Sequence, residues 1–266
     1  VLISVLIRRN GGKMKIIAVC NQKGGTGKSS TVLALAYGLY GAGNKILVID
    51  LDPQCNASYA LGIDLLNVPT VYHVLKHEKP IREAIQPVRV GLDVLTGSLA
   101  LAGADAEFTQ TGREYMLKEA LEAVKDKYDY IIIDNAPTLG IMVTNALTAA
   151  DHVVIPVGAG DAFSLLGLTQ LYGLIQNVQK YCNHDLKIAG LLITRYNSRT
   201  NANQIMREQV QNVADQIGTK VFNAAIRESV SIKESQILRT DLFEQSPKGN
   251  ATVDYRSFIE ELLNEH

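Results

Sequence analysis

A glycine-rich segment near the start of the chain carries the residue types that bind phosphate. Residues 15–31 read KIIAVCNQKGGTGKSST, with three glycines within four positions. Glycines let a backbone approach a ligand closely because they have no side chain. The ammonium group of Lys28 can contact the β- and γ-phosphates of a nucleotide, and the hydroxyl group of Ser29 can ligate Mg²⁺. The segment therefore predicts a site for a nucleoside triphosphate and Mg²⁺.

A second lysine in this segment has no evident phosphate of its own. The usual phosphate-binding loop reads G-x-x-x-x-G-K-[ST], and Gln22 stands where the first glycine is expected. Lys23 follows at the start of the turn. Either this lysine has a separate role at the site, or the segment is a glycine turn with incidental lysines. The strand and helix expected on either side of the turn favour the phosphate site.

This chemistry requires that the loop be held between a strand and a helix. Residues 16–19 form an apolar run typical of a strand buried on both faces, and the residues after Lys28 are typical of a helix whose first turn faces the ligand. Residues 67–87 are typical of short helices. Further strands are expected at 45–50, 92–96, 128–134, 152–157, 187–194 and 220–225, and further helices at 113–127, 164–180, 202–218 and from 255 onward. This alternation predicts an α/β fold with a doubly wound, mostly parallel sheet and helices on both faces.

Carboxylates end two of the expected strands. Asp50 ends the strand at 45–50 and Asp52 follows it, while Asp134 ends the strand at 128–134. The carboxyl ends of parallel strands meet at one edge of a sheet, which places these groups beside the glycine-rich loop. Carboxylates there could hold metal-bound water or orient an attacking water molecule. Asp50 and Asp52 could instead cap the next helix, although alternation along an extended chain puts both on one side and favours a Mg²⁺-and-water site.

The composition is that of an ordinary globular protein. The chain has 266 residues with 26 basic and 27 acidic side chains. This near-neutral balance argues against a protein that binds nucleic acid over its whole surface. Three separated cysteines without C-x-x-C spacing predict neither a disulfide framework nor a zinc site and favour a reducing cytosol. His73 and His77 have a spacing used for metals, but a place on a helix surface is favoured because no third ligand stands nearby. No apolar run approaches the roughly 20 residues of a membrane helix.

Contact with DNA would have to come from a local basic patch. Between residues 187 and 248, nine basic side chains stand against six acidic ones. Arg199 and Arg207 are the candidates for phosphate contact in this region. A solvated surface explains the small basic surplus nearly as well.

Residues 1–13 are not expected to belong to the folded protein. Met14 directly precedes the first strand, and the run RRNGGK before it reads like a translated ribosome-binding site. Residues 1–13 are therefore interpreted as a non-native upstream extension. Residues 14–266 are expected to form one domain.

Three motifs in order along the chain resemble those of the ParA/MinD family of deviant Walker A ATPases. KGGTGKSS resembles the family's phosphate loop, in which the extra lysine crosses a dimer interface to the partner's nucleotide. DLDPQ resembles the second motif, and DNAPTLG resembles D-x-P-P-S-L-G, with Ala136 in place of the first proline. The similarity covers nearly all of the chain after Met14. It is closest to the small, Soj-like ParA partition ATPases that lack an N-terminal DNA-binding domain.

The motifs and the resemblance together imply roles for individual residues. Lys23, Lys28 and Asp52 are expected to be catalytic, with Asp52 orienting the attacking water. Ser29, Asp50 and Asp134 are expected to lie at the metal site. The expected nucleotide-binding residues are Lys23, Gly24, Gly25, Thr26, Gly27, Lys28, Ser29, Ser30 and Arg227.

The resemblance also implies a function. ATP and Mg²⁺ would close two subunits into a homodimer that binds DNA non-specifically, and a ParB-like centromere-binding protein would stimulate an otherwise slow hydrolysis. Such a protein would be cytoplasmic and nucleoid-associated, and would segregate a plasmid, chromosome or mobile element.

Two other function classes share the same core. A MinD-like positioning or regulatory ATPase would act through protein or membrane-surface partners. No membrane partner is expected, because the C-terminal run SFIEELLNEH is acidic and anionic lipid should repel it. An iron–sulfur enzyme would need cysteines in a cluster motif, and neither Cys55 nor Cys182 stands in one.

Overall fold

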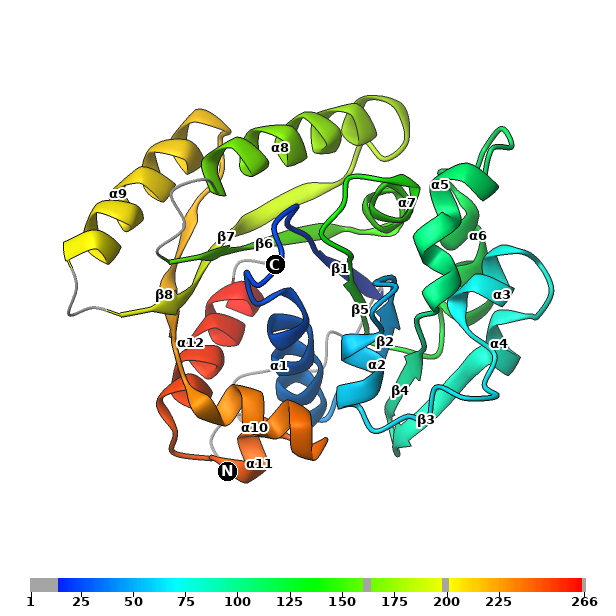
Figure 1. The fold of residues 1–266 in the computed structure, drawn as a ribbon, viewed down its shortest axis with the longest axis horizontal. Coiled ribbons are helices and arrows are strands. Elements are labelled where there is room, and N and C mark those ends of the chain that lie inside the picture. The colour runs from blue at the N-terminus through cyan, green and yellow to red at the C-terminus, as the bar shows by residue number, and fades with distance from the viewer. Residues whose placement is uncertain (1–13, 160–163, 198–200, 265–266) are drawn as a thin grey trace.

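The protein is built around one eight-stranded sheet with helices on both faces (Figure 1). The computed structural model describes residues 14–159, 164–197 and 201–264. The strand order is β3-β4-β2-β5-β1-β6-β7-β8, and every neighbouring pair is parallel except β3 with β4. The predicted fold class, a doubly wound and mostly parallel α/β sheet, is confirmed.

The strands are β1 (Lys15–Val19), β2 (Ile46–Asp50), β3 (Ile85–Arg89), β4 (Leu92–Leu95), β5 (Tyr130–Asp134), β6 (His152–Gly158), β7 (Lys187–Tyr196) and β8 (Val221–Arg227). The longer helices are α1 (Lys28–Gly41), α7 (Ile141–Ala149), α8 (Ser164–Tyr181), α9 (Asn201–Gln216), α10 (Val230–Leu238) and α12 (Asn250–Asn264). The shorter ones are α2 (Asn56–Ala60), α3 (Val71–Leu75), α4 (Ile81–Ala84), α5 (Ala104–Glu107), α6 (Met116–Leu121), α11 (Leu242–Gln245) and the 3₁₀ helices η2 (Leu99–Gly103) and η3 (Glu122–Val124).

Two expected elements differ from the sequence-based prediction, and six helices in the described part of the chain were not predicted: α2, η2, α5, α7, α10 and α11. The stretch expected to be only short helices contains β3, which pairs antiparallel at the edge of the sheet. Pro87 lies in this strand, which an edge position tolerates because proline cannot donate to a second neighbour. The single helix expected at 113–127 is shorter, since α6 gives way to η3 at Glu122.

Alternate residues of the central strands contribute to two separate cores. Ile16 and Ala18 of β1 face the core under α7, α8 and α9, whereas Ile17 and Val19 face the core under α1 and α12. All five residues of β2 and of β5 are buried because helices cover both faces of the sheet. This explains the unbroken apolar runs from which the strands were predicted.

The C-terminal helix α12 is part of the second core. Its apolar stripe, Tyr255, Phe258, Ile259 and Leu262, is buried, as the helical spacing predicts. The carboxylate of Glu261 in α12 accepts hydrogen bonds from two backbone amides of the edge strand β8, from Asn223 at 3.0 Å and from Ala224 at 3.2 Å. The apolar face of α12 is therefore used inside the protein.

The central position of β1 determines where the site forms. β1 lies between β5 and β6, so Val19 is level with Asp134, and Asp50 of β2 is level with the same residue. The glycine-rich loop and both carboxylates thus meet at the carboxyl edge of the sheet, where the crossovers change direction. None of the helices in the described part of the chain is long and apolar enough to span a membrane.

Candidate functional site

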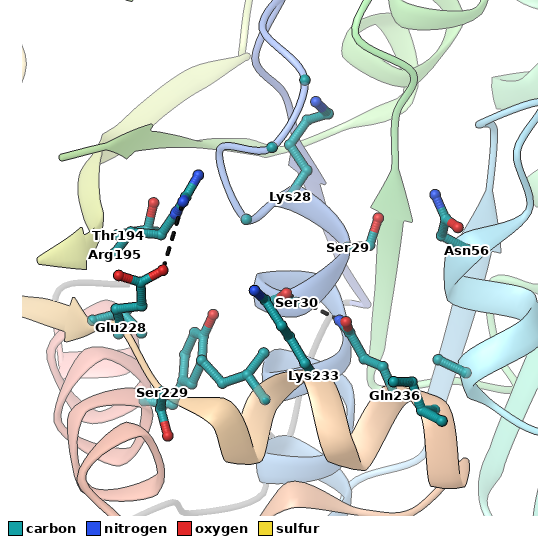
Figure 2. A pocket seen from close by; sticks show the side chains of 18 of the residues that line it. Lys28, Ser29, Ser30, Asn56, Thr194, Arg195, Glu228, Ser229, Lys233 and Gln236 are labelled. Atoms are coloured by element: carbon teal, nitrogen blue, oxygen red, sulfur yellow. Dashed lines mark hydrogen bonds and ion pairs between the residues drawn. The ribbon is translucent and has the colours of Figure 1, made fainter. Parts of the chain in front are cut away.

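A cavity of about 760 Å³ opens at the carboxyl edge of the sheet, in front of the first turn of α1 (Figure 2). The glycine-rich loop forms one side, and α10 forms the opposite side. Asp52, Tyr59, Thr194, Arg195, Arg227 and Glu228 complete much of the wall. Every expected phosphate-loop glycine, together with Lys28, Ser29 and Ser30, lines this cavity.

The loop needs glycine at two positions for its backbone conformation. Gly25 and Gly27 have φ angles of 76° and 83°, which side chains strongly disfavour. Gly27 is the N-cap of α1, so the turn directs the first amides of the helix into the cavity. Lys28 is buried, and its Nζ atom donates to the carbonyl oxygen of Lys23 at 2.9 Å. Burial lowers the pKa of Lys28, while nearby Asp134 opposes this shift.

Three polar residues that the motif does not include anchor the loop. Thr194 at the end of β7 donates its Oγ1 proton to the carbonyl oxygen of Thr26 at 2.8 Å. Asn21 donates to the carbonyl oxygen of Pro156 at 2.6 Å, and Asn135 donates to that of Val19 at 3.2 Å. All three lie at or near the carboxyl ends of parallel strands: Asn21 after β1, Asn135 after β5 and Thr194 in the last residues of β7. That position at the active edge of a parallel sheet is the signal by which they could have been predicted.

Asp134 has a buried carboxylate oxygen that lacks a protein partner. The residue is fully buried, and its Oδ1 atom accepts from the amide of Asn135 at 3.1 Å. The Oδ2 atom has no hydrogen-bond partner among the described residues. Burial and the nearby carboxylate of Asp50 raise the pKa of Asp134 to about 8, while the side chain of Ser29 acts in the opposite direction. An orphaned carboxylate oxygen beside the Ser29 hydroxyl fits a hydrated Mg²⁺ ion.

Replacement of Asp134 by asparagine is expected to stabilise the ligand-free protein while it weakens the effect of Mg²⁺. Because folding raises this pKa from 3.8, the contribution of Asp134 to stability is present below about pH 4 and is lost as the pH rises through 8. At pH 7, Asp134→Asn should increase the free energy of unfolding by roughly 2 kcal/mol. Urea unfolding at several pH values measures this. ADP titrations with and without Mg²⁺ should show a smaller benefit from the metal.

The exposed carboxylate of Asp126 provides the matched control for this experiment. Asp126→Asn should leave both the stability and the Mg²⁺ dependence unchanged, since a surface carboxylate changes little on folding. An Asp134→Asn variant that is less stable than the wild type at pH 8, or that keeps the full Mg²⁺ effect, would contradict the assignment.

The two aspartates after β2 have different surroundings. Asp50 is fully buried, and its Oδ2 atom accepts from both the amide and the hydroxyl of Ser58, at 2.9 and 2.7 Å. Asp50 thus caps α2, which agrees with the capping alternative for this residue. Burial raises the pKa of Asp50 to about 6, and the hydrogen bonds from Ser58 keep this rise smaller than burial alone would make it. Asp52 lines the cavity, and its Oδ1 atom accepts from the amide of Gln54 at 2.9 Å.

Arg227 lines the cavity but its guanidinium group is paired. Its Nη2 and Nε atoms donate to the carboxylate of Asp254 in α12, at 2.6 and 2.9 Å. Contact with a nucleotide base remains a prediction for this residue. Ser30, two residues beyond Lys28, has its hydroxyl oxygen 3.0 Å from the Nε2 atom of Gln236 in α10.

His73 and Arg207 are not among the residues that line this cavity. The Nδ1 atom of His73 is 3.1 Å from the amide of Thr70 and completes a capping box on α3. No group of three potential metal ligands from histidine, cysteine and acidic side chains occurs within the described ranges. The guanidinium of Arg207 donates to the carbonyl oxygen of Asn223 at 3.4 Å. Arg199 and the segment 1–13 lie outside the described residues, and all three cysteines are free.

Several known proteins are similar to this chain over most of its length. The family model described as AAA domain matches residues 14–188. The sporulation initiation inhibitor protein Soj of Bacillus subtilis is 40% identical over 252 residues, covering 93% of this chain and 98% of Soj.

Two solved structures have a fold similar to that of this chain over most of its length. A plasmid partition protein from Borrelia burgdorferi is 30% identical, with a TM-score of 0.69, and the match covers 89% of this chain and 99% of that one. A cobyrinic acid a,c-diamide synthase from Mycobacterium smegmatis, solved with a bound ATP analogue and magnesium, is 33% identical, with a TM-score of 0.81 and 95% coverage of both chains.

Proposed function

The chain belongs to the ParA/MinD family of P-loop ATPases, in its Soj-like branch, and from this premise we propose that it is an ATP-hydrolysing partition protein. The observation that carries the proposal is a cavity lined by Lys28, Ser29 and Asp52. The buried Asp134, whose orphaned oxygen lies behind this wall, interacts with the side chain of Ser29. In this proposal, residues 14–266 form a single ATPase domain.

ATP and Mg²⁺ are the proposed ligands of the cavity. The amides that follow Gly24 and the ammonium group of Lys28 bind the phosphates, while Ser29 and Asp134 hold the metal ion. The metal neutralises negative charge on the phosphates when it is bound. Asp52 lies on the wall of the cavity and orients the water that attacks the terminal phosphate. Asp50 supports this wall through its bonds to α2, and its role beside the metal remains an expectation from the motif.

Lys23 connects nucleotide binding to assembly in this proposal. Its carbonyl oxygen accepts a hydrogen bond from the Lys28 ammonium group, and Lys23 is not among the residues that line the cavity. The ammonium group of Lys23 would contact the nucleotide of a second subunit and close a homodimer around two ATP molecules. Two basic surfaces would then lie on one particle, so that the dimer holds DNA non-specifically and associates with the nucleoid. A ParB-like partner would speed the slow hydrolysis and release the DNA.

The test is a gel shift on non-specific duplex DNA with ATP, with ADP and without nucleotide. The wild type should bind only with ATP, and binding should fall steeply with salt because it depends on the number of phosphates neutralised. Lys23→Ala should keep its ATP affinity, through Lys28, but lose the shift with ATP. Lys79→Ala, at an exposed lysine outside the cavity and outside residues 187–248, is the matched control and should still shift DNA.

Two outcomes would contradict the DNA part of the proposal. One is DNA binding that ignores the nucleotide, and the other is no binding at low salt with ATP. Either result would favour a MinD-like regulator that acts through a protein surface. A membrane surface is disfavoured by the buried apolar face of α12.

A further inference from the structure

Helix α10 forms a second polar wall of the nucleotide cavity. Four of its residues line the cavity: Ile232, Lys233, Gln236 and Ile237. Lys233 and Gln236 are one turn apart on this helix, and Figure 2 shows both side chains directed from α10 toward Ser30 in the first turn of α1. The bond from Gln236 to the Ser30 hydroxyl, at 3.0 Å, holds the two helices together at this point.

The other cations on the cavity wall are already engaged. Lys28 bonds to the carbonyl oxygen of Lys23 at 2.9 Å, and Arg227 pairs with Asp254 at 2.6 Å. Arg195 lies 3.6 Å from the carboxylate of Glu228, a pair that is visible in Figure 2. Lys233 forms no ion pair with a residue in the described part of the chain, and its side chain is exposed to the cavity. It is therefore available to an anionic ligand.

The part of α1 that faces Lys233 across the cavity indicates which part of the ligand this lysine meets. Lys28 begins α1 and belongs to the end that receives the β- and γ-phosphates. Ser30 lies two residues further, about 3 Å along the helix axis at 1.5 Å per residue. That distance is comparable to the spacing between neighbouring phosphorus atoms of a polyphosphate. Gln236 contacts Ser30, so a cation one turn away on α10 faces the phosphate that follows the β- and γ-phosphates, which is the α-phosphate.

We propose that Lys233 binds the α-phosphate of the nucleotide within its own subunit. This inference rests on the proposed nucleotide function and extends it, since Lys28 and Lys233 would hold the polyphosphate from opposite walls. Gln236 is the positioning residue that sets the distance between α10 and α1. An α-phosphate is common to ADP and ATP, so the contact should contribute equally to the affinity for both nucleotides, whether or not a dimer forms.

The experiment is calorimetric titration of full-length Lys233→Met with Mg²⁺-ADP and with Mg²⁺-ATP. A charge-assisted contact at a partly exposed site predicts about a 5- to 10-fold weaker affinity for each nucleotide, while Lys233→Arg should stay within about 3-fold of the wild type. The loss should shrink with added salt, because the contact is ionic. Urea unfolding without ligand should be unchanged, since the side chain is exposed.

Two comparisons separate this inference from the proposed function. Lys248→Met, at an exposed lysine outside the cavity, should bind both nucleotides as the wild type does. Lys28→Ala, titrated in parallel, reports on the nucleotide site itself. Unchanged ADP affinity in Lys233→Met, with the expected loss in Lys28→Ala, would overturn the role of Lys233 and leave the nucleotide site intact. A loss for ATP alone would also overturn it, because it would assign Lys233 to the dimer contact.

Discussion

Replacement of Lys28 by alanine is expected to weaken the binding of ATP and ADP by about 100- to 1,000-fold. The expectation rests on the burial of this side chain beneath the phosphate loop, with its ammonium group 2.9 Å from the carbonyl oxygen of Lys23. The substitution removes a buried positive charge from the β- and γ-phosphates and also removes the bond that closes the loop. Titration with a fluorescent ADP analogue, followed by competition with unlabelled ATP, measures both affinities.

A loss of this size must be distinguished from unfolding. Lys28 carries a pKa lowered by burial, so its removal relieves a buried charge in the ligand-free protein and should not reduce stability strongly. Urea unfolding without nucleotide should therefore give a midpoint at or above that of the wild type, with no further gain on adding Mg²⁺-ADP. Nucleotide titration curves equal to those of the wild type in a folded Lys28→Ala variant would place the site elsewhere.

The sequence correctly predicted the strand, glycine turn and helix around the proposed phosphate site because every part of this segment is local. A buried apolar run, three glycines and an apolar helical continuation stand close together in the sequence, and β1, the loop and α1 follow in that order. The positive φ angles of Gly25 and Gly27 are properties of the turn itself. A motif of this kind needs no distant contact to be recognised.

The positions of the anchors at the sheet edge are visible in the sequence, but the residues with which the anchors and walls of the site bond are not. The bond between Thr194 and the carbonyl oxygen of Thr26 joins residues 168 positions apart, and Gln236 reaches Ser30 across 206 positions. No spacing in the sequence identifies such pairs, because they depend on which strands become neighbours in the sheet. For the same reason the sequence did not show that Arg227 would be paired with Asp254. Strand β3 was missed because its partner β4 determines its conformation more strongly than its own residues do.

The different surroundings of the Asp50 and Asp52 carboxylates also depend on the tertiary structure. Both residues follow one strand, and alternation alone places their side chains on the same side. In the folded protein, Ser58 of α2 takes both hydrogen bonds at the Oδ2 atom of Asp50, whereas Asp52 stays on the cavity wall with one bond to Gln54. This difference favours Asp52 over Asp50 as the carboxylate that we propose to act on a water molecule beside the nucleotide.

The replacement of Asp52 by asparagine is expected to slow ATP hydrolysis by about 100-fold or more while ATP affinity stays close to that of the wild type. An asparagine keeps an oxygen that can accept from the amide of Gln54, so the turn after β2 is retained and only the charge that orients water is lost. Asp52→Ala removes that bond as well, and the difference between the two variants measures the structural part of the role. Phosphate release at saturating ATP measures the turnover of each variant.

With hydrolysis blocked, the ATP-bound dimer of Asp52→Asn should accumulate. Light scattering with ATP should therefore report twice the monomer mass for this variant over hours. Normal turnover in Asp52→Asn, or a monomer with ATP under conditions in which the wild type dimerises, would show that Asp52 serves only the turn.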